Sequence, residues 1–203
     1  MKNEHVSMVT ASGKKVFPFA LTPDQIDEES IARHLATEAR WSGATRHPKY
    51  PARIFYSVAE HSLYVAEYVR HVLKRPDLEL EALLHDAPEY LVGDQVRPVK
   101  YSPAFREPFK ALEDSVERVI CQKYGLIYPL PPEVKTADDA VCRAEWEQIV
   151  PKDPNEVWNT SLALSVPAAR IEVQMVSPYT AYLTFVEALD CAIKRRHLYQ
   201  KAA

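Results

Sequence analysis

The sequence predicts an all-α fold, and three observations lead to that prediction. Only 4 glycines stand against 16 prolines, which favours helices joined by proline-containing loops over a hairpin-rich sheet protein. In several long stretches the apolar residues recur at spacings of three and four, the period of a helix with one buried face. A length of 203 residues with 47% hydrophobic residues suits one domain with a sizeable core. We therefore expect a helical bundle that forms a single domain over residues 1–203.

The expected elements follow in order from start and stop signals in the chain. A small β-hairpin is expected in the N-terminal arm, 1–26, where two short apolar stretches surround the sequence ASGK. Thr22, Pro23 and Gln25 have the pattern of a capping box, which predicts a short helical turn. Periodicity and capping residues predict helices over 27–41, 57–72, 77–88, 104–124, 132–148 and 178–196. The segment 150–203 is thus expected to be a loop followed by a helix that packs on the core.

Two of these helices carry signals that bear on function. The first is expected to present Arg40 and Trp41 at its C-terminal end. Pro88 lies inside the pattern of the third, where a proline removes a hydrogen bond and clashes with the preceding turn. We therefore expect a kink or a helix end directly after Asp86.

Charge and composition exclude several classes of protein. A formal net charge of -3 and a pI near 6.2 provide no general attraction to nucleic acid or to an anionic membrane. The N-terminus has no apolar signal core, and no window approaches the roughly 18 apolar residues of a membrane span. Cys121, Cys142 and Cys191 are widely spaced, so neither a disulfide framework nor a CxxC zinc site is indicated. We expect a cytoplasmic protein with reduced thiols and with no membrane or nucleic-acid partner.

The stretch ALLHDAPEYLVGDQVRPVK, residues 82–100, contains the strongest candidate for a functional centre. His85 and Asp86 are adjacent and follow a helical run of leucines. Neighbours on a helix point about 100° apart, so both side chains can reach an ion that lies between their directions. Glu89 returns to the face of His85 one turn later. The spacing therefore indicates a metal site with an acid nearby.

Two other segments offer further ligands. His61 falls on the buried stripe of the second expected helix, and Asp138 belongs to the row 134, 138, 141 and 145 beside the apolar stripe of the fifth. Asp139 is expected to face outward. Two imidazoles and two carboxylates suit one divalent Mn, Co, Fe, Ni or Zn ion per subunit better than Mg or Ca. In an octahedral shell, four protein ligands leave positions for water and a phosphate oxygen, as phosphate-ester hydrolysis requires.

Each of these residues also has an ordinary structural interpretation. A single histidine on an apolar helix face, such as His61, is more often a core residue than a ligand. Asp138 could be a solvated or capping residue, and Glu89 could be an exposed helix residue that pairs with a nearby Arg or Lys. Arg40 and Trp41 could be a helix-end cation and a core aromatic. The functional interpretation depends on their occurrence together, in this order.

That order carries a resemblance to a known family. The sequence of a histidine at 61, the pair His85 and Asp86, and an aspartate at 138 resembles the H…HD…D signature of the HD-domain metal-dependent phosphohydrolases. The chain looks most similar to the branch that contains bacterial 5′-deoxynucleotidases and phage-type dATP triphosphohydrolases. Arg40 and Trp41, SVAEHS, HDAPEYLVGD followed by RPVK, and KTADDAV all have counterparts there. The resemblance covers residues 27–145 well and the SPYTAYLTFVEAL helix more weakly.

The resemblance implies an all-α bundle with the metal held among its central helices. The metal ligands would be His61, His85, Asp86 and Asp138. Glu89 would be the general acid or base, Arg40 would bind a phosphate and Trp41 would pack on the sugar. Asp94 matches a further active-site aspartate, which would hydrogen-bond the sugar or a water.

Four basic residues are further candidates for phosphate binding, and two features depart from the family pattern. The four are Arg46, His47, Lys49 and Lys100. Pro88 stands where the relatives have a small residue. The insertion between Trp41 and His61 is longer than in the relatives that cleave monophosphates. Both departures bear on the shape of the substrate pocket.

The residues and the resemblance together predict a metal-dependent phosphohydrolase that acts on a small nucleotide, first of all a deoxynucleoside 5′-monophosphate. A deoxynucleoside triphosphate triphosphohydrolase on the same site is the alternative. A non-catalytic regulatory or nucleic-acid-binding module on the same scaffold has less support. A di-iron oxygenase would need extra histidines around the core, and the chain has only seven in all. The resemblance and the apolar, tyrosine-bearing last helix favour a homo-oligomer, with a dimer as the first expectation.

Overall fold

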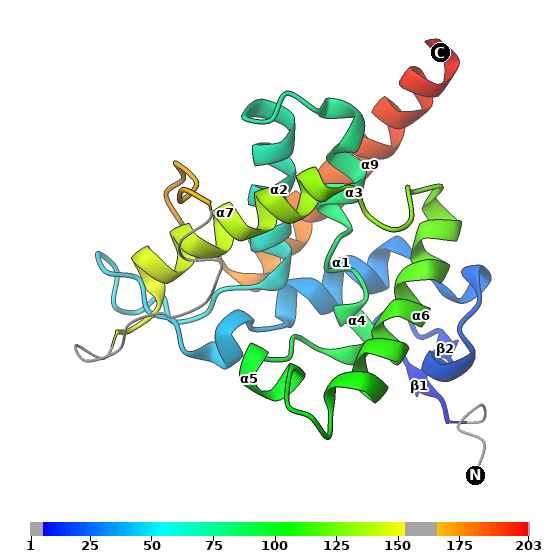
Figure 1. Ribbon diagram of the computed structural model, residues 1–203, viewed down its shortest axis with the longest axis horizontal. Helices are drawn as coiled ribbons and strands as arrows, with labels where there is room; N and C mark the ends of the chain where they lie inside the picture. The colour runs from blue at the N-terminus through cyan, green and yellow to red at the C-terminus, as the bar shows by residue number, and fades with distance from the viewer. Residues whose placement is uncertain (1–5, 153–165, 203) are drawn as a thin grey trace.

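Helices make up nearly all the regular structure of the described residues, 6–152 and 166–202 of this computed structural model (Figure 1). The longer helices are α1 (Glu28–Thr37), α2 (Val58–His71), α6 (Arg106–Tyr124), α7 (Pro132–Ile149) and α9 (Pro178–Ala202). The shorter helices are α3 (Glu79–Leu83), α4 (Glu89–Val92) and α5 (Arg97–Lys100). The prediction of an all-α fold is confirmed. The part of the predicted loop that falls on 153–165 lies outside the described residues.

The predicted N-terminal hairpin and helical turn are both present. Strands β1 (Met8–Val9) and β2 (Lys15–Val16) pair antiparallel, with Met8 opposite Val16. Thr22 and Gln25 form a capping box on the 3-10 turn η3 (Pro23–Gln25), as predicted. This arm lies against α6 through η3 and the 3-10 turn η2 (Pro18–Ala20).

Helix α2 is the central element of the fold. It contacts α1, α3, α7 and α9, and Val58, Val65 and Val69 on it are fully buried. The Oγ atom of Ser57 accepts a hydrogen bond from the backbone N–H of Glu60 at 3.1 Å, so Ser57 caps α2 at the start of the helix predicted over 57–72. Val72, at the end of the helix predicted over 57–72, is 58% exposed because α2 ends at the preceding residue. The central position of α2 places its N-terminal turn inside the molecule.

The first helix ends earlier than predicted. α1 stops at Thr37, and Ala39 instead forms an isolated antiparallel bridge with Ser57. The backbone N–H of Arg40 donates to the carbonyl of Tyr56 at 2.9 Å. This pairing pulls the chain out of the helix, so Arg40 and Trp41 lie in a separate 3-10 turn, η4 (Arg40–Gly43), beside the start of α2.

The third helix also ends before the position that we predicted. The 3-10 turn η5 (Pro76–Leu78) leads into α3, which stops at Leu83, so His85 and Asp86 lie in a non-helical turn between α3 and α4. Pro88 occupies the N-cap position of α4, where its missing N–H is harmless. The break was predicted, but it lies before the His-Asp pair and not after it. The segment after α4 contains the short helix α5, which lies between the helices predicted over 77–88 and 104–124.

The last helix continues beyond its predicted end. α9 begins at Pro178 as predicted and contacts α1, α2 and α3, but it extends past Arg196 to Ala202. Arg195 does not simply compensate the helix dipole at a terminus, because its guanidinium binds the Glu79 carboxylate at 2.6 and 2.7 Å. Arg196 likewise pairs with Glu81, which is fully buried. The basic residues therefore attach α9 to α3.

Two negative expectations concern the described part of the chain. None of the helices described is long and apolar enough to cross a bilayer. Cys121, Cys142 and Cys191 are free thiols, the first two of them buried.

Candidate metal centre

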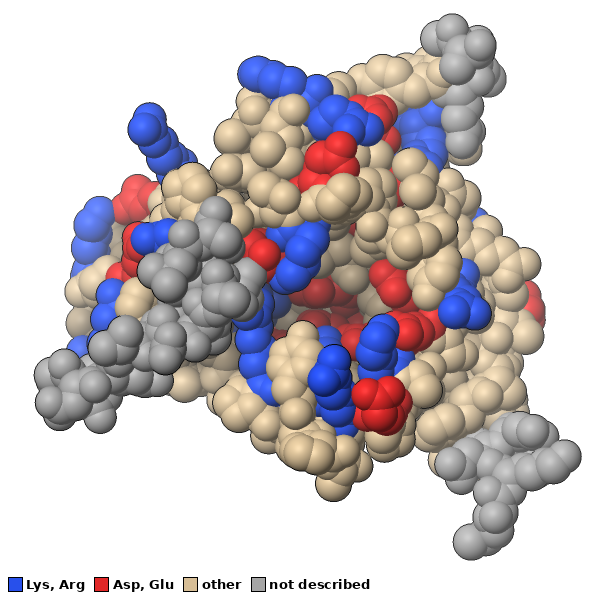
Figure 2. All heavy atoms as spheres, viewed as in Figure 1, with Lys and Arg blue, Asp and Glu red and all other residues tan. Residues whose placement is uncertain are grey.

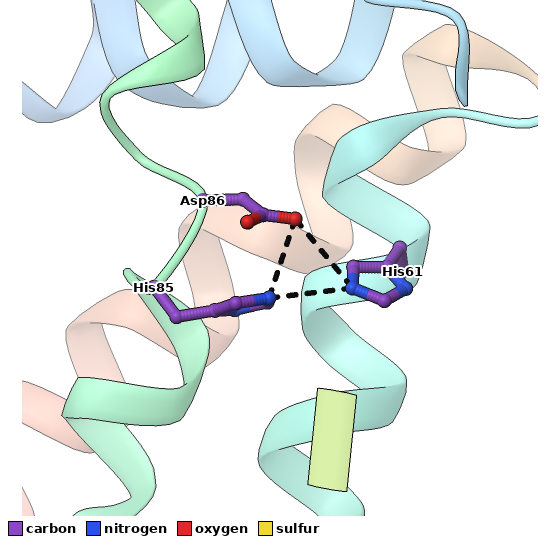
Figure 3. Close-up of side chains that lie close together, drawn as sticks. All are labelled: His61, His85 and Asp86. Atoms are coloured by element: carbon purple, nitrogen blue, oxygen red, sulfur yellow. Dashed lines mark hydrogen bonds and ion pairs between the residues drawn. The ribbon is translucent and has the colours of Figure 1, made fainter. Parts of the chain in front are cut away.

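Three of the predicted ligands meet at one point. His61 from α2 and the adjacent His85 and Asp86 from the turn between α3 and α4 point toward one another (Figure 3). The Nε2 atom of His85 lies 3.3 Å from Nε2 of His61 and 3.2 Å from Oδ2 of Asp86. The distance from Nε2 of His61 to Oδ2 of Asp86 is 3.5 Å. Atoms that bind one ion at about 2.1 Å lie about 3 Å apart when their bonds are perpendicular. This cluster could hold a metal ion.

Asp138 of α7 reaches the same point from a third segment. Its Oδ1 atom lies 3.2 Å from Nε2 of His61 and 3.9 Å from Nε2 of His85. Its Oδ2 atom accepts from the Lys135 ammonium at 2.7 Å, so one oxygen remains directed at the cluster. Asp139, which we expected to face outward, has a side chain only 12% exposed and also pairs with Lys135. The prediction for Asp139 was wrong because this lysine draws both carboxylates together.

The imidazole of His85 is oriented by its own turn. Its Nδ1 atom donates to the backbone carbonyl of Ala82 at 2.8 Å. A proton on Nδ1 leaves the lone pair of Nε2 free and directed at the cluster. The non-helical turn therefore sets the tautomer that a metal ligand needs.

His61 is oriented by Glu145, a residue that the sequence analysis missed. The Nδ1 atom of His61 donates to Oε1 of Glu145 at 2.5 Å, and the Tyr56 hydroxyl donates to the same oxygen at 2.9 Å. All three side chains are fully buried. A metal-binding histidine commonly donates its other ring nitrogen to a carboxylate in this way. The signal was available, because Glu145 follows Asp138 by seven residues, two helical turns, on the same face of α7.

The second oxygen of Glu145 holds the Arg40 and Trp41 pair. Oε2 accepts from the indole N–H of Trp41 at 3.0 Å and from Nε of Arg40 at 3.3 Å. Trp41 packs against a small core cluster that includes Tyr56, and its backbone has the left-handed values φ 57° and ψ 25°, unusual for a bulky residue. Such strain persists only where surrounding contacts enforce it. One buried carboxylate thus positions a ligand, a guanidinium and an indole.

The guanidinium of Arg40 also contacts the cluster directly. Its Nη1 atom donates to Oδ2 of Asp86 at 3.1 Å, and its side chain is only 11% exposed. Burial lowers the pKa of Arg40, but the carboxylates of Glu145, Asp94 and Asp86 more than offset this, so the group stays charged. The structure therefore brings a fixed positive charge to the predicted position.

The charges in the cluster compensate one another. Burial and Arg40 lower the pKa of His61, but Glu145 and Asp138 outweigh them and raise it to about 9. Burial opposes ionisation of Asp86 and Asp138, yet the neighbouring imidazoles hold the pKa of both carboxyls below their usual range. Without a metal, a proton on His61 supplies part of the positive charge that these carboxylates require.

Glu89 lies beside the cluster and faces a cavity. It is the first residue of α4 and is 9% exposed, and its Oε2 atom is buried without a hydrogen-bond partner among the described residues. Burial, followed by the charges of Asp86 and Asp94, raises the pKa of Glu89 well above its usual range. A buried carboxyl group that is unpartnered and readily protonated is suited to proton transfer.

The cavity has a volume of about 240 Å³ and is lined by His85, Asp86, Glu89 and Asp138 together with side chains of α5, α6 and α7. Figure 2 shows a hollow in this face of the molecule, with acidic atoms inside it and basic side chains near its rim. Lys100, a predicted phosphate-binding residue, lines the cavity while its ammonium pairs with Glu113 at 2.7 Å. The cluster is therefore accessible from one side.

Asp94 lies close to this group without a side-chain hydrogen bond among the described residues. The chain turns back at Gly93, whose φ of 74° and ψ of 155° are nearly exclusive to glycine. The backbone N–H of Asp94 donates to Glu38 at 3.1 Å. Burial raises the pKa of Asp94, Arg40 opposes this, and Asp86 adds to the rise. The predicted position near the site is consistent with these charges.

Three basic residues of the loop after Trp41 have other contacts. Arg46 is exposed and donates its backbone N–H to Ile149 at 2.8 Å. His47 is buried, and its Nδ1 accepts from the backbone N–H groups of Lys49 and Tyr50, so it organises its own loop. Lys49 pairs with Glu172 at 2.7 Å. None of the three lines the cavity beside the cluster.

Comparison with known proteins places the chain among bacterial relatives. No protein-family model matches it. It is 29% identical over 182 residues to "Uncharacterized protein YfdR" of Escherichia coli K12, with 89% of this chain and 92% of that protein covered. It is 38% identical over 146 residues to "Uncharacterized protein RCAP_rcc00048" of Rhodobacter capsulatus, with 68% of this chain and 70% of that protein covered. The chain therefore belongs to the same protein family as RCAP_rcc00048.

Proposed function

We propose that the chain is an HD-domain metal-dependent phosphohydrolase that cleaves the phosphate ester of a deoxynucleoside 5′-monophosphate. One observation carries the proposal. Two imidazole Nε2 atoms and two carboxylate oxygens from three segments converge beside an unpartnered carboxyl group at the wall of a cavity. The order of these residues along the chain matches the H…HD…D pattern of that family.

The donor set fits a divalent transition metal. His61, His85, Asp86 and Asp138 would hold the ion. Each imidazole would bind it through Nε2, because Nδ1 of His61 donates to Glu145 and Nδ1 of His85 donates to the Ala82 carbonyl. Mixed nitrogen and oxygen ligands suit Mn, Co, Fe, Ni or Zn. When bound, the ion would activate a water and polarise a phosphoryl oxygen.

The other residues divide the remaining tasks. The Glu89 carboxyl, whose pKa is raised by burial and by the charges of Asp86 and Asp94, would give a proton to the leaving 5′-oxygen as the P–O bond breaks. Arg40 and Lys100 would bind non-bridging phosphate oxygens from two sides, since one contacts Asp86 and the other lines the cavity. Asp94 would accept a hydrogen bond from the sugar, and Trp41 would position Arg40 through their shared contact with Glu145.

A hydrolysis screen tests the proposal. The purified protein would be stripped with a chelator, reloaded with single metals and incubated with nucleoside and deoxynucleoside mono-, di- and triphosphates, and inorganic phosphate, pyrophosphate and triphosphate would be measured. We expect metal-dependent release of phosphate from deoxynucleoside monophosphates. Release that survives both chelation and His85→Ala would contradict the proposal, as would no release from any phosphate ester with any of the metals.

A further inference from the structure

The cavity beside the cluster has an acidic wall that the proposed reaction does not use. Six of its lining residues carry a carboxyl group and two are lysines. Asp86, Asp138 and Glu89 belong to the metal cluster and the proton transfer. The other three, Glu113, Asp114 and Glu117, lie on α6 and are called the α6 carboxylates below.

The α6 carboxylates differ in how far their charges are compensated. Glu113 accepts from Lys100 at 2.7 Å, and Asp114 accepts from Lys110 at 2.7 and 2.8 Å. Glu117 has no hydrogen bond or ion pair with any described residue. The wall therefore presents at least one carboxyl group without a direct cationic partner. Burial and the charges of Asp114 and Glu113 raise the pKa of Glu117.

A second observation indicates that a ligand enters this cavity. The Oε2 atom of Glu89 is buried without a partner among the described residues, and Glu89 lines the same cavity as the α6 carboxylates. Buried polar atoms are normally hydrogen-bonded, so an unpartnered one at a cavity wall points to a group that is supplied from outside. A phosphate seated between the cluster and Lys100 would extend its leaving group from there toward α6.

The size of the cavity and the charge of its wall both disfavour a leaving group that carries further phosphoryl groups. A volume of about 240 Å³ lies below the range of roughly 300–1,000 Å³ typical of ligand pockets. A leaving group that carries further phosphoryl groups would bring two or more negative charges toward the wall. Like charges repel strongly where the effective dielectric constant is reduced.

We infer that the α6 carboxylates determine substrate specificity by selecting phosphate monoesters whose leaving group has no negative charge and by rejecting polyphosphates. The inference rests on the proposed phosphohydrolase function and adds the class of leaving group. Glu117 contributes most, because Lys100 and Lys110 partly neutralise the other two.

The test compares one nucleoside in two charge states. The ratio of kcat/KM for dCMP to that for dCTP would be measured for the metal-loaded wild type, Glu117→Gln and Glu107→Gln. The reaction would be followed as inorganic phosphate, which is released with deoxycytidine from dCMP and with dCDP from dCTP. Glu107 is the matched control, since it lies on the same helix, does not line the cavity and has a side chain 81% exposed. Circular dichroism and metal content would verify that all three proteins are folded and loaded.

We expect the wild type to prefer dCMP by about 100-fold and Glu117→Gln to lower that preference about tenfold. Glu107→Gln should leave the preference unchanged. Equal use of dCTP by the wild type, or the same ratio in Glu117→Gln, would overturn the inference while hydrolysis of dCMP left the proposed function intact. If neither nucleotide nor any other phosphate ester is hydrolysed, the proposed function fails and the inference fails with it.

Discussion

The two sides of the cluster formed by His61, His85, Asp86 and Asp138 are built differently. On the α7 side, His61 is fully buried and Glu145 makes hydrogen bonds with His61, Tyr56, Trp41 and Arg40. On the α4 side, the Asp86 side chain is 20% exposed and a buried oxygen of Glu89 has no partner among the described residues. One side is a closed network of satisfied groups, and the other borders a cavity.

This contrast suggests that one side of the cluster fixes the geometry of its side chains, whereas the other side is open to binding and proton transfer. Buried polar networks that are fully hydrogen-bonded fix a geometry, whereas an unsatisfied buried group is free to bind or to exchange a proton. Under the proposed function, the α7 side would position the metal ligands and the α4 side would receive the substrate. Substitutions on the two sides should accordingly have different signatures: loss of metal affinity on one and loss of turnover on the other.

Removal of a ligand shared by both sides should have the greatest effect. His85→Ala deletes an Nε2 atom that lies 3.2 Å from Asp86 and 3.3 Å from His61. We expect loss of stoichiometric metal and of all hydrolysis above background, measured by elemental analysis and phosphate release. His71→Ala, at an exposed position at the end of α2, is the control and should retain both. Full metal content in His85→Ala would refute the role of this residue as a ligand.

Glu89→Gln tests the α4 side, where the proposed proton transfer takes place. The amide keeps the shape of the side chain but can neither give nor take a proton at neutral pH. We expect kcat to fall about 100- to 10,000-fold, the usual contribution of general acid–base catalysis, with metal content unchanged. The prediction fails if turnover persists, or if the metal is lost together with it.

Glu145→Gln tests the positioning side. Loss of the carboxylate that accepts from His61 should weaken metal affinity about 10- to 100-fold, as is typical when an outer-shell partner of a ligand is changed. Glu81→Gln is the matched control, because Glu81 is equally buried and pairs with Arg196 on α9. Both variants should unfold at a lower temperature, but only Glu145→Gln should bind metal more weakly. Equal metal affinity in the two variants would show that Glu145 stabilises the fold but does not position His61 for metal binding.

Metal affinity should also depend on pH, because His61 on the α7 side binds a proton when no metal is present. The pKa of His61 is raised to about 9, so the metal-free protein carries a proton there at neutral pH and metal binding must displace it. Affinity should therefore rise with pH, by up to about tenfold per unit below pH 9, and the dependence should flatten above that value. Calorimetric titration at pH 6, 7 and 8 in two buffers of different ionisation enthalpy measures both affinity and proton release. No proton release at pH 7 would contradict this.

Local signals predicted some elements correctly, and tertiary contacts determined the rest. The N-cap at Ser57 and the end of α6 at Gly125 depend on nearby residues, so they could be read from the sequence. The early end of α1 could not, because it depends on the pairing of Ala39 with Ser57 across eighteen residues of chain. The same holds for α9, whose basic residues pair with α3 instead of ending the helix.

The candidate site shows the same division. His61, His85, Asp86 and Asp138 were identified from their order and from helical periodicity, although His85 and Asp86 proved to lie in a turn. Glu145 was missed although its spacing places it on the same face of α7 as Asp138, because the spacing does not show that this face contacts α2. The loop candidates Arg46, His47 and Lys49 do not line the cavity, because a loop sequence does not specify which way its side chains point.

Metal stoichiometry is the most direct measurement of whether these side chains form one centre. The metal-stripped wild type and His61→Ala would each be titrated with Mn²⁺ and with Zn²⁺, with bound metal determined by elemental analysis after desalting. We predict one ion per chain for the wild type and none for His61→Ala, because the variant lacks the nitrogen that lies within 3.5 Å of Asp86 and 3.2 Å of Asp138. A wild type that retains neither metal, or a variant that retains one ion per chain, would contradict the assignment of a metal centre to this cluster.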